Sequence, residues 1–271
     1  MRLPYCFLSL ATGIAMAAGA FHLCATPPEE IPAPRPAGEQ FAAPRFAGAQ
    51  SCMATACHGK STYTGADGDV LVRGAEYTFW RDMDPHARAG ATLHSPRSRR
   101  MLAALKLVEQ ADISRRCGSC HSPMPAPEHR LDSFVARQGV SCEDCHGPSE
   151  HWRSTHFRQA SSPMTETKKL AVRTEVCAGC HIGSPGRVVD HDLIAAGHPV
   201  LQFEMASFHD RLPKHWDEVR DRGRQPGGFE TALWSHGQRA LLERAVADVE
   251  SMKSGRIELS SFDCYACHHE G

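Results

Sequence analysis

Residues 140–148 read Val140-Ser-Cys-Glu-Asp-Cys-His-Gly-Pro148, in which two cysteines enclose two residues and a histidine follows directly. This Cys-x-x-Cys-His pattern occurs four times in the 271-residue chain. The copies are Cys117, Cys120 and His121; Cys142, Cys145 and His146; Cys177, Cys180 and His181; and Cys264, Cys267 and His268. Random placement of the 12 cysteines and 17 histidines would produce about 0.03 such copies. The four copies are therefore not accidental, and they indicate the chemistry for which the rest of the chain is built.

Cys-x-x-Cys-His is the attachment signature of c-type haem. The two thiols form thioethers with the haem vinyl groups, and the adjacent histidine reaches the iron. The short spacing lets one turn of chain do both. Zinc knuckles also use Cys-x-x-Cys pairs, but they do not require a histidine after every second cysteine. Because all four copies keep this histidine, we favour haem c over zinc.

A fifth candidate site has a longer loop, Cys52-Met-Ala-Thr-Ala-Cys57-His58. The alternative is a disulfide between its two cysteines, which an exported compartment would permit. We favour haem because His58 directly follows the second cysteine. The five sites then use every cysteine except Cys6 and Cys24, which lie in or beside the N-terminal apolar segment. The sequence predicts five covalently attached haems c.

Three further stretches resemble the cytochrome c554-like family of multihaem c-type cytochromes. They are Asp84-Pro-His86-Ala-Arg-Ala89; the 140–148 stretch with Trp152-x-x-x-His156; and His191-Asp-Leu-Ile-Ala-Ala-Gly-His198-Pro followed by Leu212-Pro-Lys-His215-Trp216. The resemblance implies that histidines in these stretches are distal haem ligands. It points first to His86, His156 and His198, and then to His191 and His215.

A second imidazole on each iron would give low-spin haems suited to electron transfer. His151 competes with His156, which we prefer because it completes the Trp-x-x-x-His element. We expect His94, His209, His236 and His269 to be structural or surface residues.

The predicted fold is mostly α with long loops, wrapped around a stack of covalently bound haems. Ser95 and Pro96 form an N-cap and first helical residue, and Met101, Leu102, Leu105 and Val108 then make one apolar face of a helix of about four turns. No alternating strand pattern stands out. Since aromatic residues make up only 7% of the chain, we expect the haems to supply much of the apolar core.

Two more helices are predicted towards the C-terminus. One covers residues 237–253, with Leu241, Leu242, Ala245, Val246 and Val249 on one side. A short one covers residues 192–196 and ends at Gly197.

The N-terminus predicts export. Arg2 precedes an apolar stretch at residues 3–20 with small residues at its end, which is typical of a signal peptide. A retained membrane anchor and a lipoprotein cleavage before Cys24 are the alternatives. We divide the chain into a signal peptide or anchor at 1–25, a Pro/Ala-rich linker at 26–49 and a multihaem cytochrome c domain at 50–271. The location is then periplasmic or otherwise extracytoplasmic, with a membrane tether if the anchor is retained.

Charge and composition limit the classes of function that the chain can have. Lys plus Arg total 30 and Asp plus Glu total 31, so no basic excess points to nucleic acid. We expect an electron carrier that exchanges electrons with redox partner proteins. The alternative is a multihaem oxidoreductase with one open haem acting on nitrogen or sulfur oxides, although the chain has no Cys-x-x-Cys-Lys variant and only four tyrosines. A third interpretation is a docking subunit of a respiratory complex.

The five Cys-Cys-His sites predict the mass of the mature protein. Mass spectrometry should find five haem additions, because ten cysteines are available in five pairs. A protein carrying four haems would show that Cys52 and Cys57 do not form a haem site.

Overall fold

The chain is described here from a computed structural model. It divides into two units, Met1–Phe41 and Ala42–Gly271, and the described residues all belong to the second unit. They are residues 43–64, 72–135, 139–158, 162–217, 228–252, 257–262 and 264–268. The predicted signal or anchor at 1–25 lies outside them. Within the described residues, no helix is both long and apolar enough to cross a membrane.

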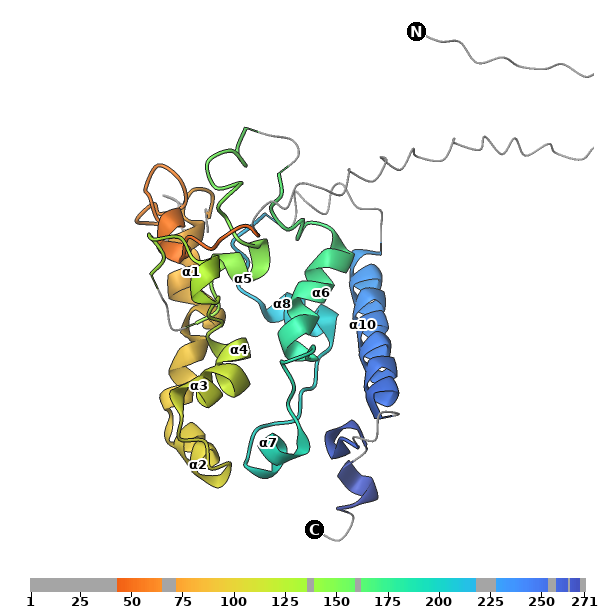
Figure 1. The fold of residues 1–271 in the computed structure, drawn as a ribbon. Coiled ribbons are helices and arrows are strands. Elements are labelled where there is room, and N and C mark those ends of the chain that lie inside the picture. Colours follow the sequence, from red (N-terminus) through yellow and green to blue (C-terminus); the bar gives the residue numbers. More distant parts are fainter. Residues whose placement is uncertain are drawn as a thin grey trace, which may run out of the picture. The chain divides into compact units, whose positions relative to one another are not determined.

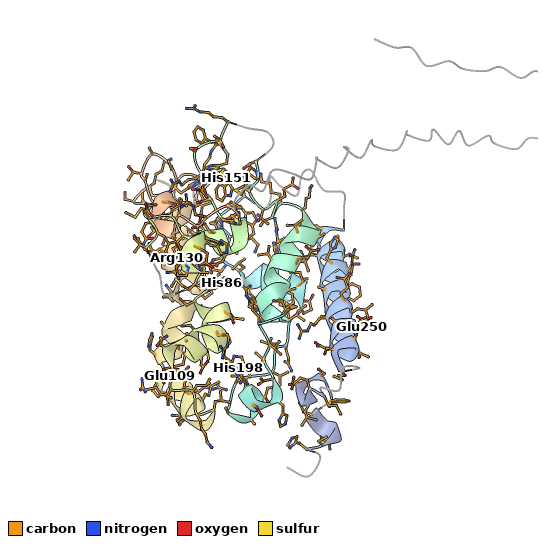
Figure 2. All side chains as sticks on the ribbon, in the orientation of Figure 1. His86, Glu109, Arg130, His151, His198 and Glu250 are labelled. Carbon is orange, nitrogen blue, oxygen red and sulfur yellow. The ribbon has the colours of Figure 1, made fainter. Side chains whose placement is uncertain are left out.

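The described residues are mostly helical and contain no strands, as predicted (Figure 1). Their β pairing consists of two isolated bridges, and one of these joins Phe46 to Arg130, which Figure 2 labels. The α-helices are α1 Glu76–Met83, α2 Pro96–Ala104, α3 Gln110–Ile113, α4 Ser119–His121, α5 Cys142–His146, α6 Leu170–His181, α7 His191–Ala195, α8 Met205–Arg211 and α10 Phe229–Met252. Shorter turns are η1 Ala49–Cys52, η2 Pro85–His94, the π-helical η3 Ser114–Gly118, η4 Pro127–His129, η5 Leu259–Ser261 and η6 Cys264–Ala266.

Helix α2 begins where the sequence predicts. Ser95 Oγ accepts a hydrogen bond of 3.1 Å from the Ser98 amide, and Pro96 is the first helical residue. The predicted length of four turns is wrong, because Lys106 adopts a φ of 54° and ends the helix. Val108 therefore lies beyond α2 and is 82% exposed.

Helix α7 is confirmed as a short helix one residue earlier than predicted. The Asp190 carboxylate accepts a hydrogen bond from the Leu193 amide at 2.9 Å and caps its first turn. Gly197, with a φ of 111°, follows its end. This left-handed conformation favours glycine.

Helix α10 starts eight residues before the predicted position and buries a different face. Its buried residues are Phe229, Leu233 and Gly237, whereas the predicted face residues Leu242, Val246 and Val249 are exposed. The reason is tertiary: α10 contacts α6 and α8, and the residues it buries there all lie in its first half.

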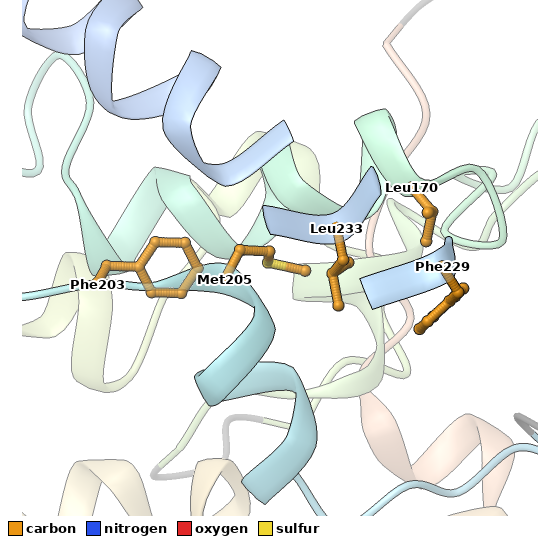
Figure 3. Close-up of a cluster of buried hydrophobic side chains, with 5 residues drawn as sticks. All are labelled: Leu170, Phe203, Met205, Phe229 and Leu233. Atoms are coloured by element: carbon orange, nitrogen blue, oxygen red, sulfur yellow. The ribbon is translucent and has the colours of Figure 1, made fainter. Parts of the chain in front are cut away.

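The main apolar cluster of the protein itself is small. Its buried members are Leu170, Phe203, Met205, Phe229 and Leu233 (Figure 3). Gly237 allows α10 to approach Met205 closely, since a Cβ at this glycine would lie 2.6 Å from Met205 Cβ. This cluster holds α6, α8 and α10 together.

Glu143 connects the start of the described chain to α5. Its carboxylate is 2% exposed and accepts hydrogen bonds from the amides of Ala47, Gly48 and Ser149 at 2.9, 2.7 and 2.8 Å. Numbered in chain order, the five cysteine motifs end at His58, His121, His146, His181 and His268. Residues 43–49, the last part of the predicted linker, thus pack against the third of these motifs.

Truncating a side chain should affect the free energy of unfolding on one face of α10 but not on the other. Leu233→Ala should lower the free energy of unfolding by about 2–5 kcal/mol, because it opens a cavity in the cluster of Figure 3. Leu242→Ala is the control on the same helix, where a side chain that is 65% exposed should change stability by no more than about 0.5 kcal/mol. Denaturant unfolding of the haem-loaded protein, followed by circular dichroism, measures both. Equal losses would contradict the assigned packing.

Candidate functional site

A cavity of about 1900 Å³ occupies the centre of the described unit. Its lining includes the cysteines and histidines of the first four motifs, together with four predicted distal histidines: Cys52, Cys57, His58, Cys117, Cys120, His121, Cys142, Cys145, His146, Cys177, Cys180, His181, His86, His156, His198 and His215. Sites for single small ligands usually measure about 300–1000 Å³. The cavity therefore has room for several cofactors.

Short helices present three of the motif histidines. His121, His146 and His181 are the last residues of α4, α5 and α6. Residues three and four apart share one face of a helix, so each of these motifs turns its cysteines and its histidine to the same side. The first turn of α5 is fixed by a capping box between Ser141 and Asp144.

Every motif histidine lies beside a different predicted distal histidine. The separations between ring centroids are 5.9 Å for His58 with His156, 6.3 Å for His121 with His198, 6.1 Å for His146 with His215, 5.9 Å for His181 with His86 and 6.4 Å for His268 with His191. Two imidazoles that share one metal, with bonds of about 2.0–2.1 Å each, place their ring centres roughly 6 Å apart. The five pairs therefore fit two-histidine coordination of five metal ions.

Five of these ten histidines use Nδ1 for a hydrogen bond with another described residue. The partners are Glu76 Oε2 for His58 at 2.8 Å, Asp84 Oδ1 for His86 at 2.9 Å, Thr92 Oγ1 for His121 at 3.1 Å, the Arg153 carbonyl for His156 at 3.0 Å and the Pro199 carbonyl for His198 at 2.7 Å. A carboxylate or carbonyl only accepts, so Nδ1 of His58, His86, His156 and His198 carries the proton and the lone pair lies on Nε2. The Thr92 hydroxyl donates its own proton to the Ala89 carbonyl at 2.6 Å, so it too accepts from Nδ1 of His121. That tautomer suits coordination through Nε2.

The third pair has a different environment. The Nδ1 atoms of His146 and His215 are both buried and have no hydrogen-bond partner among the described residues. Burial lowers the pKa of His146 to about 4 and also lowers the pKa of His215. Both rings are therefore neutral, which is the form that binds a metal.

At two other histidines, a nearby carboxylate raises the pKa of the imidazole. The hydrogen bond to Glu76 raises the pKa of His58, and the hydrogen bond to Asp84 raises the pKa of His86. Neither Glu76 nor Asp84 was predicted from the sequence as a functional residue. Asp84 stands only two residues before His86, so the sequence offered a local indication that the two interact. Glu76 is distant from His58 in the chain, so the sequence offered no such indication.

Thiol contacts show which motifs are neighbours. A hydrogen bond with Cys142 lowers the pKa of Cys52, and one with Cys180 lowers the pKa of Cys120. The first motif therefore lies against the third, and the second against the fourth. Cys145, whose pKa burial raises to about 12, also lies close enough to Cys177 to interact electrostatically, which joins the third motif to the fourth.

The fifth motif lies outside this cavity and is exposed at Cys264, Cys267 and His268. Its partner His191 is the first residue of α7, and the His191 amide donates a 2.9 Å hydrogen bond to Glu258. Helix α7 contacts η5, as Figure 1 also shows at the C-terminal end of the chain. Because His198 follows α7 closely, this helix connects the fifth pair to the second.

His156 and His151 are placed differently. The ring of His156 stacks on that of His58, while the side chain of His151, labelled in Figure 2, is exposed. Among the other histidines, His209 is buried and bonds to Arg173 through Nε2 at 2.8 Å. The predicted structural residue His269 lies outside the described residues.

Residues 52–147 match the family model of cytochrome c554 and c-prime. This span contains the first three motifs and His86, and the match confirms the resemblance for this part of the chain. It supports a haem-based electron-transfer protein with covalently bound haem c. No curated protein and no solved structure matches the chain.

The position of His156 predicts a spectroscopic change. His156→Ala should convert one iron from low-spin to high-spin, because the ring opposite His58 is lost. His151→Ala, on the same loop, is the matched control and should leave the spectrum unchanged. Electron paramagnetic resonance of the oxidised protein detects the difference, and a high-spin signal from the His151 variant alone would reverse the assignment.

Proposed function

We propose that the protein is an extracytoplasmic electron carrier that holds five haems c, each between two histidines. The observation that carries the proposal is the one-to-one pairing of five motif histidines with five other histidines at 5.9–6.4 Å. In this proposal the first to fifth motif histidines pair with His156, His198, His215, His86 and His191, respectively.

The residues present fit such a cofactor. Each motif has two thiols for covalent attachment and one histidine, and the first four motifs line a common cavity. Met101 and Leu102 of α2, and Leu105 just after it, line the cavity, although no residue of α2 is buried by protein. When bound, haem c supplies reversible one-electron chemistry at its iron.

The pairing favours the carrier over the enzyme alternative. An oxidoreductase acting on nitrogen or sulfur oxides needs an iron with an open position. Each of the five motif histidines has a second ring beside it, so every site has two imidazoles available. We therefore assign the five sites to electron transfer.

The neighbour relations suit a relay. In space, the order of motifs is first, third, fourth, second and fifth, which follows from the thiol contacts and from α7. The exposed fifth motif gives redox partner proteins access to one end of this series. The N-terminal signal, the linker and membership of a respiratory complex belong to the same proposal and rest on the sequence alone.

One spectroscopic experiment tests the proposal. The oxidised protein should show only low-spin ferric signals, and the reduced protein should not bind carbon monoxide, because two histidines occupy each iron. A stoichiometric high-spin signal together with carbon monoxide binding in the wild-type protein would overturn the carrier and favour the oxidoreductase.

A further inference from the structure

We propose that Glu76 and Asp84 are positioning residues that lower the reduction potentials of two of the five irons. These are the irons assigned to His58 with His156 and to His181 with His86. The third site, between His146 and His215, is then higher in potential than its two neighbours. The inference rests on the proposed function and adds an electrostatic order to it.

Glu76 reaches His58 from the first turn of α1. Its Oε2 lies 2.8 Å from His58 Nδ1, and the Tyr77 amide donates a 3.0 Å hydrogen bond to the His58 carbonyl. The side-chain and main-chain bonds together fix the start of α1 against the first motif. The carboxylate therefore accepts the Nδ1 proton in a defined geometry.

Asp84 is held even more closely. Its side chain is 7% exposed, and Oδ1 lies 2.9 Å from both the His86 amide nitrogen and His86 Nδ1. Pro85 stands between the two residues and fixes the local φ. The carboxylate is shielded from water and directed at the ring that faces His181.

An anionic acceptor on Nδ1–H makes the imidazole a stronger donor to a metal. Stronger donation favours the ferric over the ferrous state and so lowers the reduction potential. At the third site both Nδ1 atoms are buried and neither has an acceptor among the described residues. Burial disfavours the extra charge of the ferric state, which raises the potential there.

The difference in reduction potential matters because the third site lies between the two sites with carboxylates. Its motif touches the first through Cys52 and Cys142, and lies beside the fourth through Cys145 and Cys177. The two sites with carboxylates therefore flank the site without one. An electron that enters the chain is retained at the interior third site rather than at its neighbours.

Asp84→Asn and Glu76→Gln test the inference in the full haem-loaded protein. Each change keeps an oxygen that can accept from Nδ1–H but removes the charge. Both carboxylates also act electrostatically on His215 of the third site. We therefore expect the haem at the directly bonded histidine to show the largest upward shift in midpoint potential in each variant, with five haems retained by mass and all irons low-spin. Redox titration followed by electron paramagnetic resonance assigns the shifted haem.

Asp82→Asn is the matched control. Asp82 lies two residues from Asp84, but its carboxylate bonds to Arg81 at 2.6 Å and is partly exposed. An equal upward shift in the Asp82 and Asp84 variants would show a general charge effect and overturn the inference. A midpoint that stays unchanged in both Asp84→Asn and Glu76→Gln would also overturn it.

His86→Ala separates this failure from failure of the proposed function. If it produces a high-spin iron while Asp84→Asn leaves every midpoint unchanged, the ligation stands and the positioning role is wrong. If it leaves all irons low-spin, His86 is not a ligand, and both the proposed coordination and the role of Asp84 are wrong. The Glu76 arm is independent of His86 and remains decisive if the Asp84 variant does not fold.

Discussion

The facing of two imidazole rings is the contact on which the rest of the structure depends. It recurs five times, and each time it joins a cysteine motif to a histidine elsewhere in the chain. His58 and His156 bring the first cysteine motif towards the loop after α5, and His146 and His215 bring α5 towards the segment after α8. The separations vary by only 0.5 Å, between 5.9 and 6.4 Å. One repeated geometric requirement therefore arranges segments that share few other contacts.

The same requirement explains why the apolar core formed by protein side chains is small. Five buried side chains join α6, α8 and α10, while Met101 and Leu102 of α2, with Leu105 just after it, line the cavity. Apolar side chains in such positions contribute to stability only when something fills the space beside them. Covalently attached haems would fill it and would also restrict the unfolded chain. We accordingly expect folding and haem attachment to be coupled.

The five histidine pairs resemble one another in geometry but differ in what surrounds them. The group at Nδ1 is a buried carboxylate for His86, a hydroxyl for His121 and a carbonyl for His156. His146 and His215 have no partner at Nδ1 among the described residues, and all five histidines line one cavity. Such differences around a ligand tune a metal without changing the ligand itself. The chain thus has the means to give identical cofactors different properties.

The sequence alone determined the positions of the five cysteine motifs, the mostly helical class and the beginnings of α2 and α7, because each depends on residues within about one helical turn of one another. The resemblance at residues 52–147 also became visible from the sequence. Only the tertiary structure decided which histidine faces which, because the partners are far apart in the chain and several histidines compete for each place. It also decided that α10 buries Leu233 rather than Leu242, and that Glu76 reaches His58. These outcomes depend on the path of the backbone through space, which local patterns do not encode.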